Sequence, residues 1–133
     1  MQAETRVGDA GEPSGWSDGD LFDRILADVP CSASGLVRRY PDIRWLRRPT
    51  DIAALVGEQH CILSALWPLV ATGGELLYVT CSIFPEEGEL QAQWFGEVHE
   101  DAVRLDALGQ LLLPTSRASA AGWQIYRTRS RTR

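Results

Sequence analysis

The pattern of apolar and polar positions predicts a strand, a long helix and a second strand. A short apolar run at 21–29 ends at Pro30 and a Ser/Gly cluster, which is typical of a buried strand, although such a run also fits part of a buried helix. Apolar residues then recur at spacings of three, four and seven over 52–70, which predicts a helical face with Thr50 as its N-cap. The nearly continuous apolar run at 75–82 is typical of a strand buried on both faces.

The remainder of the pattern completes an α/β order. Pro68 and the Gly73-Gly74 pair are expected to end the long helix. A second helix is predicted from Pro85, with acids in its first turn, followed by short strands near 103–105, 111–113 and 123–126. A strand–helix–strand unit of this length joins parallel strands, so we expect an α/β fold with a mostly parallel sheet and antiparallel C-terminal strands.

Two cysteines lie at the ends of the two predicted parallel strands. Cys31 follows the first strand, Cys81 ends the second, and Asp28 lies just before Cys31. Neighbouring parallel strands lie roughly 5 Å apart and end at the same edge of a sheet, where ligands bind in open α/β folds. The three side chains are therefore expected to meet in a site. A buried structural cysteine and a redox dithiol are the alternatives.

The cysteine count limits the class of protein. The three cysteines show no Cys-x-x-Cys spacing, which argues against a disulfide framework and a zinc site, so no metal is expected. Cys61, in the middle of the long helix, is interpreted as a small core residue. We find no signal sequence and no apolar run near 18 residues, so a cytoplasmic protein with free thiols and no membrane partner is expected.

Charge is distributed unevenly along the chain. The net charge is −5, yet all 13 basic residues are arginines, and five of them lie within 38–48. Arginine pairs with phosphate through two hydrogen bonds, so this cluster could bind a polyanion despite the negative total. The alternative is a solvated surface. The same two interpretations apply to the arginines at 127–133.

Four short motifs, in this order and spacing, resemble one known family. They are Asp28-Val-Pro-Cys-Ser-Ala-Ser-Gly35, Arg39-Tyr-Pro-Asp-Ile-Arg-Trp45, Leu77-Tyr-Val-Thr-Cys-Ser82 and Pro85-Glu-Glu87. Together they resemble the Sun/Fmu family of RNA (cytosine-5)-methyltransferases, most closely the RsmB type that acts on small-subunit (16S) ribosomal RNA. The resemblance covers about residues 7–126 and implies a Rossmann-like fold that uses S-adenosylmethionine.

The resemblance also implies roles for the thiols. The family's Thr-Cys cysteine, which corresponds to Cys81, adds to cytosine C6 so that C5 can accept a methyl group, a case of covalent catalysis. The Pro-Cys cysteine, Cys31, helps to release the product, and Asp28 contacts the cytosine. DNA cytosine-5 enzymes use a Pro-Cys nucleophile, so Cys31 remains the alternative nucleophile. A free thiol has a pKa near 8.5, so the nucleophile needs local help to ionise.

Cofactor and RNA contacts follow from the same resemblance. Asp9, in a turn like the family's adenine-binding turn, is expected to contact the cofactor together with Asp28 and Pro30. Three arginines after the Pro-Cys motif are expected to meet RNA phosphate: Arg38, Arg39 and Arg44. Trp45 could stack on a base or pack inside the protein, and the second is favoured. Glu86 and Glu87 are interpreted as acids at a helix N-terminus rather than as catalytic groups.

The sequence also departs from the family. It has no Gly-rich cofactor loop and no basic N-terminal RNA-binding domain, so residues 1–20 are interpreted as a remnant of the cofactor-binding half, and 21–133 as the C-terminal part of the catalytic domain. The strand at 21–29 would then have an unpaired edge, which invites self-association. The chain is expected to be either part of a methyltransferase or a non-catalytic remnant that at most binds RNA.

Overall fold

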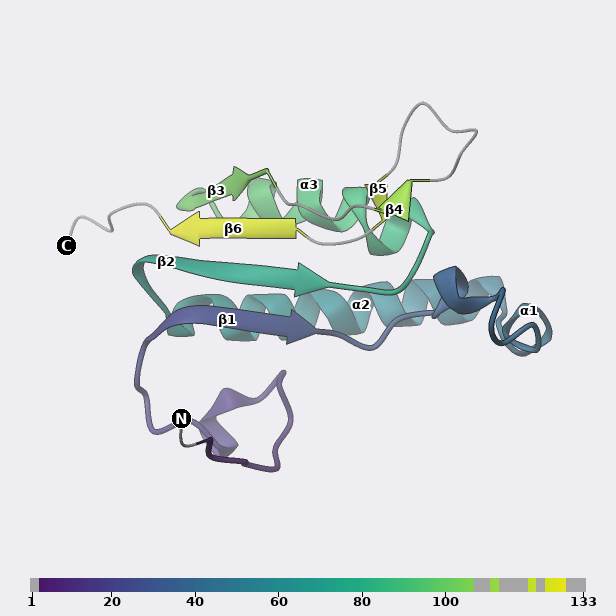
Figure 1. Ribbon diagram of the computed structural model, residues 1–133. Coiled ribbons are helices and arrows are strands. Elements are labelled where there is room, and N and C mark those ends of the chain that lie inside the picture. Colours follow the sequence, from purple (N-terminus) through teal and green to yellow (C-terminus); the bar gives the residue numbers. More distant parts are fainter. Residues whose placement is uncertain (1–2, 107–110, 113–119, 122–123, 129–133) are drawn as a thin grey trace.

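A mixed four-stranded sheet carries two helices on one of its faces (Figure 1). This computed structural model describes residues 3–106, 111–112, 120–121 and 124–128. The sheet has the order β1-β2-β6-β3, with β1 at Phe22–Asp28, β2 at Val70–Val79, β3 at Ala102–Leu105 and β6 at Gln124–Thr128. Strands β1 and β2 are parallel, whereas β6 is antiparallel to both of its neighbours, β2 and β3.

The α/β fold and the antiparallel C-terminal strand agree with the prediction. The sheet is mixed rather than mostly parallel, because β6 inserts between β2 and β3 and leaves only the β1–β2 pairing parallel. Trp123 and residue 113, which the pattern also assigned to strands, lie outside the described residues. A separate two-stranded sheet pairs β4 at Leu111–Leu112 with β5 at Ala120–Ala121.

Both long helices pack against the same face of the sheet. Helix α2 spans Pro49–Leu66 and continues into the 3-10 turn η3 at Trp67–Leu69, and α3 spans Glu89–Val98. The core between these layers is apolar and includes Leu63, Trp67, Leu76, Phe95 and Tyr126. The inward residues of the sheet alternate with outward ones, as in β1, where Ala27 is buried and Leu26 is exposed.

Short elements lie beyond the carboxyl ends of β1 and β2. The 3-10 turn η2 at Ser34–Leu36 and helix α1 at Ile43–Leu46 follow β1, and the 3-10 turn η4 at Pro85–Glu87 follows β2 (Figure 1). Residues 3–20 contain only the 3-10 turn η1 at Pro13–Gly15 and lie beside the free edge of β1. Within the part of 1–20 that the structure describes, the segment interpreted as a remnant of the cofactor-binding half is therefore coil and one turn.

Three local predictions are wrong. Thr50 is not the N-cap, because α2 begins at Pro49 and the Asp51 carboxylate accepts a hydrogen bond from the Arg48 amide at 2.9 Å. Gly73 and Gly74 lie inside β2, where they accommodate an irregularity in the β1–β2 register, and Gly73 adopts a φ of 79°. Cys61 is exposed rather than in the core, since it lies on the outer side of α2.

Helix α2 with its 3-10 extension is also more apolar than expected. Among the described residues, the segment Pro49–Leu69 is long and apolar enough to cross a membrane by length and composition alone, with a mean hydropathy of 1.2. The core helix of a soluble protein satisfies the same criterion. The inner face of α2 packs here against the sheet through Ile62, Leu63 and Leu66.

Candidate active site

The parallel β1–β2 pair brings the two predicted thiols into contact. Asp28 of β1 is the register partner of Val79 of β2, and each thiol lies a few residues past those positions. The sulfur atoms of Cys31 and Cys81 are 3.3 Å apart, and both side chains are half-buried. Asp28 is exposed at the end of β1. Fifty residues of sequence thus separate two groups that the sheet edge unites, as the strand pattern predicted.

The turns that carry the thiols are joined backbone to backbone. The amide of Gly35 donates a hydrogen bond to the carbonyl of Cys81 at 2.9 Å. A Cβ atom at position 35 would lie only 2.6 Å from that carbonyl oxygen, so glycine is required by the close approach. Ala33, just before this turn, adopts a left-handed φ of 59°. The position of Cys81 therefore depends directly on the conformation of the Cys31 turn.

Three buried serine hydroxyls add a second connection between the turns. Ser32 and Ser34 follow Cys31, and Ser82 follows Cys81. Their oxygen atoms lie 3.0 to 3.1 Å apart in all three pairings. The Ser34 hydroxyl also accepts a hydrogen bond from the Ile83 amide at 2.9 Å. A shared hydroxyl cluster of this kind fixes the two turns relative to each other.

A buried carboxylate completes this network. The Glu87 side chain is fully buried, and its oxygens accept hydrogen bonds from the Ser32 amide at 2.8 Å, the Ser82 hydroxyl at 2.6 Å and the Gln59 amide at 3.1 Å. Within the described part of the chain, no arginine or histidine forms an ion pair with it. The interpretation of Glu87 as a helix N-terminal acid missed this burial. The available signal was the Pro85-Glu-Glu87 motif itself, one of the four that carry the family resemblance.

Gln59 explains the one polar interruption on the inner face of α2. Its amide donates to the Pro30 carbonyl at 2.8 Å, in addition to Glu87, and its own oxygen accepts from Gln91 at 2.9 Å. The Tyr78 hydroxyl donates to the Glu87 carbonyl at 2.7 Å. Burial raises the pKa of Tyr78, so this hydroxyl stays protonated and acts as a donor. The helix layer is thereby connected to the turn that presents Cys31.

The Cys81 thiol is held in its neutral form. Burial, followed by the neighbouring Cys31 thiol, raises the pKa of Cys81 to about 11. Asp28 opposes ionisation in the same direction. The described residues thus do not supply the local help that ionisation of Cys81 would need.

The three predicted cofactor residues line one cavity. Asp9, Asp28 and Pro30 surround a space of about 700 Å3, together with Glu58 and apolar side chains from β1 and α2. Asp9 closes its own turn, since its carboxylate accepts a hydrogen bond from the Gly11 amide at 2.8 Å. The Trp16 ring nitrogen donates to the Asp9 carbonyl at 2.7 Å. The N-terminal segment is therefore one wall of a cavity whose other walls are β1 and α2.

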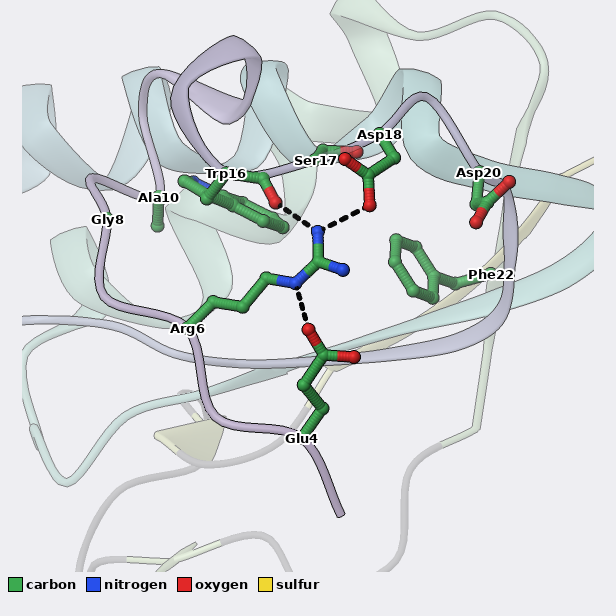
Figure 2. A pocket seen from close by; sticks show the side chains of 9 residues that line it. All are labelled: Glu4, Arg6, Gly8, Ala10, Trp16, Ser17, Asp18, Asp20 and Phe22. Atoms are coloured by element: carbon green, nitrogen blue, oxygen red, sulfur yellow. Dashed lines mark hydrogen bonds and ion pairs between the residues drawn. The ribbon is translucent and has the colours of Figure 1, made fainter. Parts of the chain in front are cut away.

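A second hollow lies on the outer side of the same segment (Figure 2). Arg6 crosses it and binds the Glu4 carboxylate at 2.6 Å and the Asp18 carboxylate at 2.7 Å, as well as the Trp16 carbonyl. Asp20 and Phe22 lie at the far side of the labelled group. These contacts pair the positive charge of Arg6 with carboxylates. This hollow of about 520 Å3 therefore presents an acidic surface rather than a phosphate-binding one.

The arginine-rich segment lies just past the Cys31 turn. Arg38, Arg39 and Arg44 are all exposed, and the Arg39 guanidinium lies 5.3 Å from the Tyr40 ring centre. Arg47 donates from Nε to the Ser32 carbonyl at 3.1 Å, which joins the segment to the thiol turn. Trp45 is 86% exposed, so the favoured packing role is wrong. Of the tail arginines, Arg127 pairs with Glu75, and 129, 131 and 133 lie outside the described residues.

Comparison with known proteins places this site in a family. The family model for the 16S rRNA methyltransferase RsmB/F matches residues 1–118. The chain belongs to the RsmB/F family. A relative in Sodalis glossinidius, ribosomal RNA small subunit methyltransferase B, is 51% identical over 124 residues, which cover 93% of this chain and 27% of that protein. This chain thus spans about a quarter of the length of the curated RsmB relatives it matches.

Solved structures support the same fold. A methyltransferase homologue from Pyrococcus horikoshii aligns with a TM-score of 0.64 and 26% identity, covering 90% of this chain and 42% of that one. NSun6 from the same organism, crystallised with SFG, aligns with a TM-score of 0.69 over 95% of this chain and 34% of its own, at 22% identity. The α/β fold with its mixed sheet is therefore shared with methyltransferases over part of their length.

Proposed function

We propose that this chain forms the cytosine-handling part of an S-adenosylmethionine-dependent RNA (cytosine-5)-methyltransferase that acts on small-subunit (16S) ribosomal RNA. The observation that carries the proposal is the contact between Cys31 and Cys81 at 3.3 Å, beside Asp28, at the carboxyl ends of two parallel strands. Family membership supports the reaction class, and the cysteine pair supplies its covalent chemistry.

Cys81 is assigned as the nucleophile. Its thiolate adds to cytosine C6, which places an electron pair on C5 and makes that carbon reactive towards an electrophilic methyl group. After methylation, the C5 proton leaves, the C5–C6 double bond forms again, and the bond between C6 and the Cys81 sulfur breaks to regenerate the thiolate. Cys31, in contact with the Cys81 sulfur, assists this release, and Asp28 hydrogen-bonds the cytosine edge.

The cavity beside Asp28 fits part of the cofactor. Its carboxylates, on Asp9, Asp28 and Glu58, suit amino groups such as that of adenine, and its apolar walls suit a flat ring. S-adenosylmethionine supplies the electrophilic methyl group of the reaction. Asp9, Asp28 and Pro30 would hold it where the N-terminal segment faces the end of β1.

The RNA is proposed to approach over the exposed arginine segment. Arg38, Arg39 and Arg44 offer guanidinium groups to phosphate near the thiol turn, and the exposed Trp45 is suited to stack on a base. A cytoplasmic location is consistent with this substrate and with free thiols.

A second candidate is a non-catalytic remnant that at most binds RNA. It is favoured by the raised pKa of Cys81, which opposes formation of the thiolate. Calorimetric titration with S-adenosylmethionine separates the two functions. Binding at about micromolar Kd, lost in Asp9→Ala, excludes the remnant, and no binding at millimolar ligand excludes the enzyme as a self-sufficient unit.

Covalent trapping tests the assigned roles of the cysteines. RNA that contains 5-fluorocytosine cannot lose a proton from C5, so the bond between the nucleophile and C6 persists and gives a gel-shifted adduct. In the presence of S-adenosylmethionine, the adduct should form in Cys31→Ala and disappear in Cys81→Ala. The reverse pattern would make Cys31 the nucleophile.

A further inference from the structure

We propose that Glu87 is a positioning residue that sets the separation of the two thiols. Its carboxylate binds the residue immediately after each cysteine, through the Ser32 amide at 2.8 Å and the Ser82 hydroxyl at 2.6 Å. One buried group thus holds both turns at once. The functional importance of this separation rests on the proposed function. That Glu87 sets the separation of the two sulfurs does not depend on that function.

Among the described residues, the Glu87 carboxyl group is surrounded by hydrogen-bond donors and not by cations. It is fully buried, and its oxygens face hydrogen-bond donors rather than cations within the described residues. Burying a carboxylate costs far more than burying an amide, because its hydration is lost. A leucine could fill the space more cheaply, so the polar side chain is best explained by the hydrogen bonds that it accepts from both turns at once.

The surroundings of Glu87 fix its own position rigidly. Its backbone carbonyl accepts the Tyr78 hydroxyl at 2.7 Å, and Gln59, which binds Glu87, also holds the Pro30 carbonyl. The carboxylate is therefore anchored to β2 and α2 before it reaches the turns. Misplacement of reacting groups by about 1 Å can slow a reaction about a hundredfold, so such anchoring has a chemical consequence.

The separation of the thiols can be measured without RNA or cofactor. A cysteine thiolate attacks oxidised glutathione, releases one glutathione thiolate and forms a mixed disulfide. The second cysteine then displaces the remaining glutathione, so that two protein thiols are oxidised and one glutathione disulfide is reduced to two thiols. The rate of this second step reports how well the Cys31 and Cys81 sulfurs are juxtaposed. The exposed Cys61 is replaced by serine in every variant, so that only the pair reacts.

We expect Glu87→Ala to slow the ring-closing step by at least about tenfold. Glu87→Gln, which retains one acceptor oxygen, should remain within about threefold of the parent chain. Glu86→Ala is the matched control, because its carboxylate is adjacent in sequence but exposed, and should leave the rate unchanged.

Loss of stability alone is separated by a second control. Tyr126→Phe removes a buried hydrogen bond from β6 to the Ala92 carbonyl of α3 and leaves every hydrogen bond of Glu87 and the serines in place, so it should lower the urea midpoint but not the ring-closing rate of the folded chain. Rates are compared at a temperature where circular dichroism shows every variant folded. Should Glu87→Ala not fold, Ser82→Ala, which removes one arm of the network, should slow closure several-fold.

Three results would overturn the proposal: an unchanged rate in folded Glu87→Ala or in Ser82→Ala, equal slowing in Glu87→Ala and Tyr126→Phe, or no rescue by Glu87→Gln. Because the assay needs neither RNA nor S-adenosylmethionine, it can fail while the proposed methyl transfer stands, and it can succeed if that function is wrong.

Discussion

The thiol turns and the N-terminal segment differ in how the chain holds them. Ser32, Ser82 and Glu87 are fully buried and bonded to one another across 55 residues of sequence. Residues 3–20, by contrast, are held by Arg6 through exposed ion pairs and by Trp16, with η1 as their one regular turn. Exposed ion pairs contribute little, whereas a buried network is costly to break. The chain therefore holds the turns of Cys31 and Cys81 through a buried network and the N-terminal segment through exposed contacts.

The largest test of this contrast is Gly35→Ala. The added methyl group would lie 2.6 Å from the Cys81 carbonyl oxygen, so the two turns must separate. We expect a loss of about 3 kcal/mol in the free energy of unfolding, measured by urea titration. Gly57→Ala in α2 is the control, because nothing lies within 4 Å of its Cβ position, and it should stabilise the chain by about 0.5 kcal/mol. A loss below about 1 kcal/mol for Gly35→Ala would show that the thiol turns are no more rigid than a surface loop.

The alkylation rate of Cys81 tests whether burial of the thiol turns lowers the reactivity of this thiol. Burial is the main cause that raises the pKa of Cys81 from an ordinary thiol value of 9.0 to about 11. At neutral pH, iodoacetamide should therefore modify Cys81 at least about tenfold more slowly than the exposed Cys61, which serves as internal reference in peptide mapping. Cys31→Ala removes the secondary cause and should lower the pKa of Cys81 without restoring that of a free thiol.

The same shift gives a direction for stability against pH. The folded state favours the neutral thiol, so the stabilisation is fully present below the unfolded pKa of 9.0 and is lost as pH rises towards about 11. Equal alkylation rates for Cys81 and Cys61 at neutral pH would contradict the burial of this site.

The sequence predicted one part of this contrast well. The apolar runs and the helical spacing located β1, α2 and β2, and two strand ends with a cysteine each were enough to infer the thiol contact. Such patterns report periodicity along one element. They could not reveal that Glu87 is buried, because its burial depends on Ser32 and Gln59 from distant elements.

The wrong predictions have the same origin. Cys61 lies on α2 in a largely apolar stretch, and only the packing of the helix decides that it faces outward. Gly73 and Gly74 are typical of a helix stop, but here they accommodate the register change where β2 begins beside β1. Local residue preferences were overridden in both cases by contacts with the sheet.

The unpaired edge of β1 leads to a prediction about self-association of the chain. Among the described strands, β1 pairs only with β2, and its Leu26 side chain is 65% exposed. We propose that this edge drives self-association, since an unpaired apolar edge strand is a template for another chain. Leu26→Lys should shift sedimentation towards the monomer by about tenfold in the dissociation constant. Leu90→Lys on α3, where the leucine is 49% exposed, should leave it unchanged. A monomeric parent chain at high concentration would rule the proposal out.

The smallest effect is expected on the N-terminal wall. Trp16→Phe keeps the ring against Gly8 but removes the hydrogen bond from the ring nitrogen to the Asp9 carbonyl. Because the bond is exposed, we expect a cost of only about 0.5 to 1 kcal/mol in the free energy of unfolding, again by urea titration, with Trp45→Phe, whose ring is 86% exposed, as the neutral control. The free energy of S-adenosylmethionine binding should fall by more than the free energy of unfolding, because Asp9 loses the contact that orients its turn. If Trp16→Phe instead destabilises the chain as strongly as Gly35→Ala, the N-terminal segment is part of the core. The contrast between buried thiol turns and an N-terminal segment held by exposed contacts is then wrong.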